Sequence, residues 1–303
     1  MTSDNVIETH ALAKRYGDVD AVHALSFQIR GPSITGFLGR NGAGKSSTIR
    51  MLLGMIKPTA GSGMVLGHRI DDPKQSLLIR RRTAYIGEEK GLYAYMTVEQ
   101  LVRFTSSFYP DWRPDIEQRL LRMYQLPLRR KVKALSKGMR TKLALLLALS
   151  RRPALLILDE PTEGLDPVSI EELLQMLTGI AAEGTTVFFS SHQLAEVERI
   201  ADSILIIERG RLVLDVSLDH LRENYRRVTA GFPARPPEAE FRLPGVERVR
   251  ASGRQITVLA SRNADAIVER ARSLSAVSVE VEPVSLREIF LDAVRTDAPA
   301  EAR

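Results

Sequence analysis

The stretch Gly39-Arg40-Asn41-Gly42-Ala43-Gly44-Lys45-Ser46, followed by Ser47, matches the pattern G-x-x-x-x-G-K-[ST] at every fixed position. An apolar run, Ile34 to Leu38, precedes it and a helical pattern, Thr48 to Met55, follows it, so strand, loop and helix are expected in that order. Glycines in such a loop let backbone N–H groups turn inward toward phosphate oxygens, and the helix N-terminus adds positive charge. The stretch therefore predicts a phosphate site for a nucleoside triphosphate.

Two side chains of this loop carry specific expectations. Lys45 is expected to reach the β- and γ-phosphates, and Ser46 to ligate Mg²⁺. The alternative, a glycine-rich turn before an ordinary helix, is disfavoured because the full pattern and both flanks are present.

The whole chain sets the outer limits. Its 303 residues are enough for two domains, and its hydrophobic content of 44% is ordinary for a globular protein. The longest apolar run, Leu143 to Leu149, falls well short of the roughly 20 residues of a membrane span. Residues 1–20 lack the apolar segment of a secretory leader, and the absence of cysteine suits a cytoplasmic protein. The formal net charge of +6 is spread along the chain, which favours a solvated surface.

The first third of the chain mixes strands and turns. Val6 to Leu12 and Val22 to Ile29 are expected to be short strands, and Tyr16, just before the turn between them, could offer an aromatic face to adenine. Taken alone, Tyr16 fits a packed strand end better. Pro58 to Gly67 is expected to be a turn-rich stretch. A strand that ends at Ile86 would place Glu88 at the sheet end where ligands of open α/β folds lie.

The middle of the chain changes to a helical period from Met96 to Ser150, with a capping-box pattern at Thr97 to Gln100. Within it, Ser136 and Gly138 open an apolar helix, and a helix start of this kind suits an anion, although Ser136 alone needs no role beyond capping.

The apolar strand Leu155 to Leu158 ends in two carboxylates. Asp159 is expected to serve Mg²⁺, and Glu160 to act as a base that orients the attacking water. After a further helix to about Ala182, the strand Thr185 to Phe189 leads to His192, which could contact a γ-phosphate but alone is more often a cap.

Beyond Tyr225 the composition changes. Ala230 to Pro237 is expected to be a linker, and a hairpin over Val246 to Ala260, a helix over Ala264 to Leu274 and a strand over Val277 to Val281 follow. A final helix places one apolar face on Leu286, Ile289, Phe290 and Val294, before a tail, Thr296 to Arg303, that is expected to be disordered. These signals predict a domain over 1–224 and a small α+β domain over 225–303.

The order of these segments resembles the ATP-binding cassette of ABC transporters over about Asn5 to Leu221. The resemblance implies an α/β P-loop NTPase fold: a RecA-like parallel-sheet core, an antiparallel β subdomain and an inserted helical subdomain at about 91–150, with the C-terminal α+β domain beyond it. It also assigns roles to individual residues. Tyr16 is similar to the aromatic that stacks on adenine, Glu88 to the γ-phosphate-sensing loop that faces the membrane partner, and His192 to the switch histidine. Asp159 and Glu160 are similar to the magnesium-site and catalytic carboxylates of the family.

The resemblance further implies a head-to-tail dimer that encloses two MgATP. Leu135 to Met139 is similar to the signature sequence, whose Ser136 and Gly138 contact the ATP of the opposite subunit, and Asp166 lies in a loop that crosses the dimer interface. Three departures from the family are Glu88 where Gln is commoner, Lys137 and Met139 inside the signature, and Ser47 where Thr is frequent. None of them removes a catalytic group, and similar departures occur in exporters with a separate membrane subunit.

The first expectation is thus an ATPase subunit that hydrolyses MgATP and drives a separate membrane permease for export. Its partners would be a second ATP-binding subunit, identical or different, and the integral membrane permease, without nucleic acid. It would lie in the cytoplasm, peripheral to the inner face of the cell membrane. The alternatives are a soluble ABC-type ATPase that acts on ribosomes or DNA, and a nucleotide-dependent binding module without hydrolysis; intact Lys45, Glu160 and His192 disfavour the latter.

Overall fold

The computed structural model of the chain describes residues 5–88 and 90–296, with side chains as far as residue 291. It divides into two compact units, residues 1–215 and 216–303. The division falls before helix α8 (Leu218–Asn224), whereas the sequence places a boundary after that helix. Within the described residues, no helix has the length and apolar character needed to cross a bilayer.

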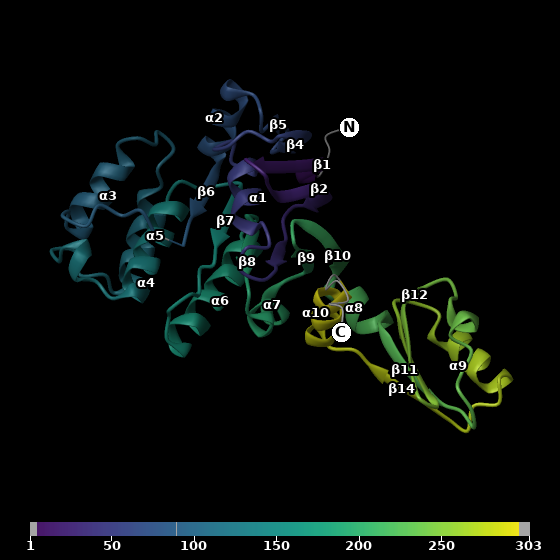
Figure 1. Ribbon diagram of the computed structural model, residues 1–303. Helices are drawn as coiled ribbons and strands as arrows, with labels where there is room; N and C mark the ends of the chain where they lie inside the picture. Colours follow the sequence, from purple (N-terminus) through teal and green to yellow (C-terminus); the bar gives the residue numbers. More distant parts are fainter. Residues whose placement is uncertain (1–4, 89, 297–303) are drawn as a thin grey trace. The chain divides into compact units, whose positions relative to one another are not determined.

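An antiparallel sheet lies at the start of the first unit (Figure 1). It contains β1 (Asn5–Tyr16), β2 (Val19–Arg30), β4 (Ala60–Val65) and β5 (His68–Arg69), in the order β2-β1-β4-β5. The turn-rich prediction for Pro58 to Gly67 was wrong, since most of this stretch is β4. A Cβ at Gly61 would lie 2.1 Å from the carbonyl oxygen of Ala11, so this glycine permits the close approach of two strands.

A second, six-stranded sheet forms the centre of the unit, in the order β10-β9-β3-β8-β7-β6. Its strands are β3 (Ile34–Leu38), β6 (Thr83–Ile86), β7 (Leu155–Asp159), β8 (Thr186–Ser191), β9 (Ser203–Glu208) and β10 (Arg211–Ser217). From β9 to β6 neighbouring strands are parallel, and every residue of β3, β7 and β8 is buried, as suits the apolar runs of β3 and β7. The carboxyl ends of β3, β7 and β8 therefore meet at one edge.

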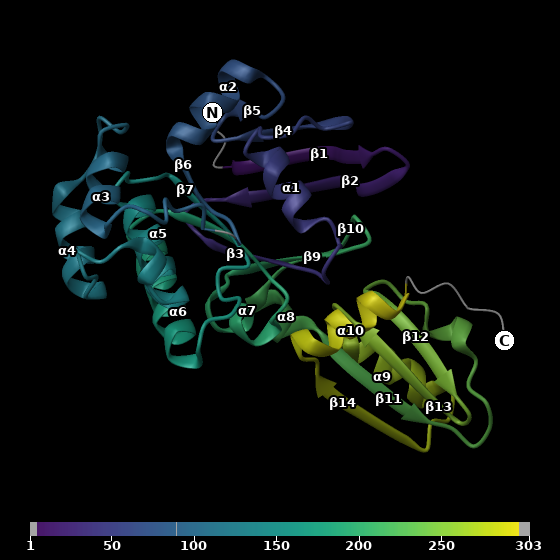
Figure 2. The same ribbon diagram turned by 60° about the vertical axis from the view of Figure 1, so that its left-hand side comes forward.

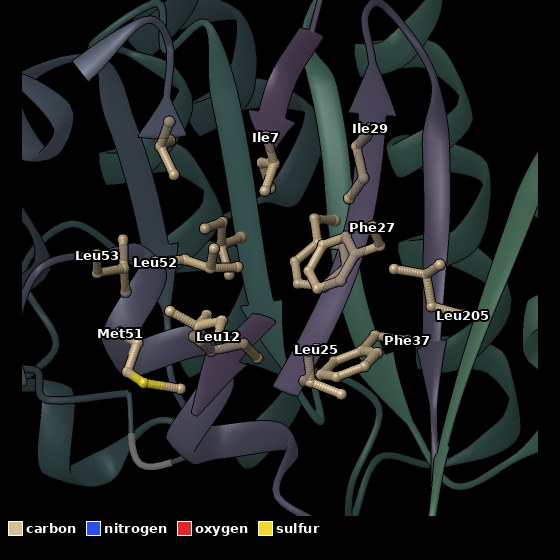
Figure 3. Close-up of a cluster of buried hydrophobic side chains, with 14 of the residues drawn as sticks. Ile7, Leu12, Leu25, Phe27, Ile29, Phe37, Met51, Leu52, Leu53 and Leu205 are labelled. Carbon is tan, nitrogen blue, oxygen red and sulfur yellow. The ribbon is translucent and has the colours of Figure 1, made fainter. Parts of the chain in front are cut away.

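A shared apolar core joins the two sheets (Figure 3). Phe27 of β2 and Phe37 of β3 both lie beside Phe188 of β8, with ring centroids 6.5 and 5.3 Å from that ring. Met51 and Leu52, from the helix that follows β3, are fully buried in the same cluster. Because packed cores resist displacement, this cluster holds both β3 and the following helix in place, and so fixes the two ends of the loop that joins them.

The helices of the first unit are α1 (Lys45–Leu52), α2 (Pro73–Arg82), α3 (Val98–Ser106), α4 (Pro114–Tyr124), α5 (Lys137–Leu149), α6 (Pro167–Ala182) and α7 (Leu194–Ile200). Figures 1 and 2 show α3, α4 and α5 gathered at one side of this unit, as a helical insertion. The capping box at Thr97 and Gln100 is present at the start of α3, and thus confirmed. Helix α2 was not predicted; Asp72 caps it and accepts hydrogen bonds from the backbone of Lys74 and Gln75.

The second unit is a four-stranded antiparallel sheet in the order β12-β13-β11-β14 (Figure 2). After α8 its elements are β11 (Arg226–Gly231), β12 (Val246–Ser252), β13 (Gln255–Ala260), α9 (Ala264–Ser273), β14 (Ser278–Pro283) and α10 (Leu286–Thr296). Helix α9 packs against β11 and β14 over a core that includes Phe241 and Ile256.

Two predictions for this unit have clear outcomes. The linker prediction for Ala230 to Pro237 was wrong at its start, because Ala230 and Gly231 belong to β11, an inner strand whose Val228 and Ala230 are buried. The predicted apolar face of the last helix is confirmed for Leu286 and Ile289, which are buried. The predicted tail, Thr296 to Arg303, begins at the last residue of α10, and its residues 297–303 lie outside the described part of the chain.

Candidate nucleotide site

The loop between β3 and α1 has the backbone of a phosphate cradle. Gly42 and Gly44 have φ angles of 81° and 105°, in the left-handed region that favours glycine. A Cβ at Gly44 would lie 2.4 Å from the carbonyl oxygen of Ala21, and one at Gly39 would lie 2.5 Å from that of Ile207. The loop is therefore seated tightly against β2 and β9, while nothing lies within 4 Å of a Cβ at Gly42.

Lys45 is the first residue of α1, and Ser46 and Ser47 follow it in the first helical turn. The side chain of Lys45 is only 6% exposed, and its Nζ donates a hydrogen bond to the carbonyl oxygen of Gly39 at 2.8 Å. The same Nζ lies 3.0 Å from Glu160 Oε1. Its charge is therefore held between the loop and the end of β7.

Glu160 directly follows β7 and lies between two side chains, those of Lys45 and His192. Its Oε1 faces Lys45, and its Oε2 lies 2.8 Å from Nδ1 of His192. Its φ angle of 48° is uncommon for a residue with a side chain, and such local strain persists only where the surroundings hold it. The structure thus brings together the three side chains that the sequence expects to be catalytic.

Ser190 is a structural neighbour that the sequence analysis missed. Its hydroxyl accepts from the backbone N–H of Glu160 at 3.0 Å and donates to Asp159 Oδ1 at 2.6 Å. One side chain of β8 therefore fixes both residues at the end of β7. Only the apolar run that ends in Ser190 and Ser191 could have indicated this, by placing hydroxyls at the same sheet edge.

A cavity of about 330 Å³ lies over the loop, a size that suits a small-molecule site. Its lining includes nine residues expected from the sequence, together with Arg40 and Glu163, which were not expected. The lining residues are Arg40, Asn41, Gly42, Gly44, Lys45, Ser46, Ser47, Glu88, Glu160, Glu163 and His192.

The residues around this cavity fit MgATP. Glycine backbone and an ammonium suit phosphate groups, and the hydroxyl of Ser46 and the carboxylate of Glu88 are oxygen donors of the kind Mg²⁺ prefers. Asp159 is only 5% exposed and is not part of the lining, so its bond to Ser190 places it behind the cavity wall. In the described part of the chain, no group of three or more carboxylate, imidazole or thiol side chains is assembled to hold a metal alone. Mg²⁺ usually needs no such group, because substrate phosphates and water complete its shell.

Tyr16 and the loop residues Gly39 and Ala43 lie outside the lining of this cavity. Tyr16 is 44% exposed at the end of β1, and Lys14 Nζ lies 5.1 Å from the centre of its ring. Ala43 is buried, and its carbonyl oxygen accepts from the N–H of Gly210, beyond β9. Ala43 therefore supports the cradle from behind, and Tyr16 presents an accessible aromatic face.

The N-termini of α5 and α6 lie against each other away from the cavity. Ser136 caps α5 through a bond from the N–H of Met139, and a Cβ at Gly138 would lie 3.0 Å from Ser169 Oγ. Asp166 caps α6 and accepts from the hydroxyl and N–H of Ser169, which hold the pKa of Asp166 below its usual range. None of Ser136, Gly138 and Asp166 lines the cavity of its own chain.

A parallel sheet, a phosphate loop at its carboxyl edge and a Lys-Glu-His cluster beside that loop define a P-loop nucleotide-binding protein. Residues 22–163 match the family model of the ABC transporter. The bacitracin transport ATP-binding protein BcrA of Bacillus licheniformis is 38% identical over 225 residues, 73% of each chain. The Nod factor export ATP-binding protein I of Neorhizobium galegae is 33% identical over 94% of this chain and 84% of its own length.

Among solved structures, an ATP-binding subunit of an ABC transporter superposes with a TM-score of 0.65 at 32% identity, over 72% of this chain and 92% of its own. A dimeric cassette bound to ADP and phosphate, MJ0796, gives a TM-score of 0.63 at 20% identity, and this likeness concerns the fold alone. The chain belongs to the family of ABC transporter ATP-binding proteins. It is an ATPase of this family, with the fold that its sequence predicts.

Proposed function

We propose that this chain is the ATP-hydrolysing subunit of an exporter, and that two such cassettes pair head-to-tail around two MgATP. The observation that carries the proposal is the position of Glu160 between Lys45 and His192 at the cavity wall. A carboxylate held there suits a general base, since it is fixed by two partners and lies beside the phosphate loop.

In the proposed reaction, Lys45 and the loop N–H groups hold the β- and γ-phosphates, and Glu160 takes a proton from the attacking water. The water oxygen forms a bond to the γ-phosphorus while the bond between that phosphorus and the bridging oxygen breaks, which leaves ADP and phosphate. His192 stabilises the transferring group and keeps the carboxylate of Glu160 oriented. Ser46 and Glu88, with Asp159 behind the cavity wall, would hold Mg²⁺, which would supply positive charge to the phosphate oxygens.

The positions of Ser136, Gly138 and Asp166 support the paired arrangement. These residues lie at helix N-termini suited to an anion, yet they do not reach the cavity of their own chain. In a head-to-tail pair they would close over the ATP of the partner, and Tyr16 would stack on adenine from the chain that supplies the phosphate loop.

A group of exposed aromatic side chains supports a separate membrane permease as the other partner. Tyr93, Tyr95, Phe104 and Phe108 are 38 to 66% exposed. The ring of Tyr93 lies beside those of Tyr95 and Phe104, and Phe104 lies beside Phe108, with ring centroids 5.0 to 5.9 Å apart. They follow Glu88 closely in the chain, and exposed aromatic clusters mark interaction sites. The name of one relative, the Nod factor export ATP-binding protein I, favours export. The cassette would thus lie at the inner face of the cell membrane.

The test uses tagged Glu160→Gln protein in the native host, with ATP present and membranes gently solubilised. The variant should lose about 10² to 10⁴ in turnover while it still binds ATP, because the amide cannot accept the proton. A polytopic membrane protein in roughly equal amount should co-purify.

Lys45→Ala is the control that should lose MgATP binding. Unchanged turnover of Glu160→Gln would overturn its role as base, and recovery with ribosomes or DNA would favour the soluble ATPase.

A further inference from the structure

Glu196 is a buried carboxylic acid that lies near the site but does not line its cavity. It belongs to α7 and is 5% exposed. Its Oε2 accepts a hydrogen bond from Thr162 Oγ1 at 2.8 Å and another from Ser191 Oγ at 3.2 Å. Its Oε1 is buried too, and no group in the described residues donates to it.

The two donors lie beside the two ends of the Glu160–His192 bond. Thr162 follows Glu160 by two residues, and Ser191 directly precedes His192. The hydroxyl of Ser191 also accepts from the N–H of Gln193 at 2.9 Å, so the backbone on both sides of His192 is held. One carboxyl group thus connects the loop after β7 to the end of β8.

We propose that Glu196 is a positioning residue for ATP hydrolysis, which holds Thr162 and Ser191 together and so keeps Glu160 Oε2 and His192 Nδ1 in contact. The inference rests on the proposed role of Glu160 as base. Glu160 needs such support because its φ angle lies in the left-handed region, which is strained for any residue other than glycine. Loosening either anchor would let the carboxylate and the imidazole move apart, and misplacement by about 1 Å costs up to roughly 10²-fold in rate.

A residue that merely fills space at this position would not need a carboxyl group. Burying an acid is costly, and an apolar side chain of similar size would pack there at lower cost. Burial raises the pKa of Glu196, with the bonds from Thr162 and Ser191 acting against it. A neutral amide keeps the acceptor oxygen for both hydroxyls, so glutamine should replace the acid, whereas alanine should not.

The experiment measures kcat and KM for ATP on the full chain with its native partners. Glu196→Ala should lose about 10-fold or more in kcat, with KM for ATP within about 2-fold, and Glu196→Gln should stay within about 2-fold of wild type in both. Thr162→Val removes one donor at constant shape and should lower kcat in the same direction. Arg199→Ala, which breaks only a surface ion pair between α7 and Glu171, is the matched control and should leave kcat unchanged.

Wild-type kcat in Glu196→Ala would overturn the proposal, and so would a glutamine variant as impaired as the alanine variant. If Glu196→Ala fails to fold, Thr162→Val decides: unchanged kcat in a folded variant contradicts the proposed role. Failure of the base assignment is distinguishable, because it would appear as normal turnover in Glu160→Gln whatever the Glu196 variants do.

Discussion

Glu160 is the residue at which the chemistry of this protein converges. The sequence predicts the acid and its neighbours, since Lys45, Glu160 and His192 each end a recognisable pattern. What it could not predict is that all three meet, with Glu160 oxygens 3.0 Å from Lys45 Nζ and 2.8 Å from His192 Nδ1. The supporting hydroxyl of Ser190 and the acid of Glu196 also escaped prediction, because a serine in a buried strand and a glutamate in a short helix carry no pattern of their own.

A pH-dependent stability follows from Glu196. Because burial raises the pKa of Glu196 in the folded state, the folded protein holds this proton over a pH range in which the unfolded chain has lost it. The free energy of unfolding of the wild type should therefore fall as pH rises from the unfolded pKa through the folded one. Two neighbouring titratable groups also act on the pKa of Glu196: His192 lowers it and Glu160 raises it.

The comparison is between wild type and Glu196→Gln, by urea unfolding at several pH values. The glutamine variant should be the more stable at neutral pH, and the difference should shrink as the pH falls below 4.5, the ordinary pKa of a glutamate, because the acid then becomes protonated in both states. A difference that grows as the pH falls would mean that Glu196 is ionised in the folded protein.

At the scale of elements, the strands around the site were the most predictable part. β3 has the predicted limits, and β7 runs one residue further than the predicted apolar run, to Asp159, because a strand buried on both faces is mostly apolar. β4 and α2 were missed for physical reasons. β4 contains two glycines where it pairs with β1, and glycine is typical of turns. α2 ends in three arginines and has little apolar face. β11 was missed because the proline-rich stretch after it suggested a linker.

Packing between β3 and α7 is tight enough to test. A Cβ at Gly36 would lie 2.3 Å from Val197 Cγ1, so Gly36→Ala should force α7 away from the sheet and destabilise the fold by about 1 to 3 kcal/mol. The double variant Gly36→Ala/Val197→Ala removes the clash and should recover part of that loss, as measured by denaturant unfolding. Additive losses in the double variant would mean that the sheet and α7 tolerate the extra methyl without contact. Because α7 begins two residues after His192, turnover should follow stability in this series.

At the scale of the whole molecule, the proposed head-to-tail pair would divide the parts of each catalytic site between two chains. The phosphate loop and Glu160 line its own cavity, whereas Ser136 caps α5 outside that cavity. If each catalytic site combines the loop of one copy with the signature helix of another, defects in the two parts should complement each other. The second unit has a core of its own around Phe241 and Ile256.

The complementation test mixes Lys45→Ala with Ser136→Asp. Aspartate preserves helix capping but places negative charge where the partner's phosphate would lie, so each variant alone should be inactive. In a mixed dimer, one site joins the intact loop of the Ser136→Asp chain to the intact signature of the Lys45→Ala chain. Random pairing of equal amounts makes half the dimers mixed, each with one intact site, so about a quarter of wild-type ATPase activity should return. A single chain that formed its whole site alone would give no recovery, because both sites would stay defective however the chains were mixed.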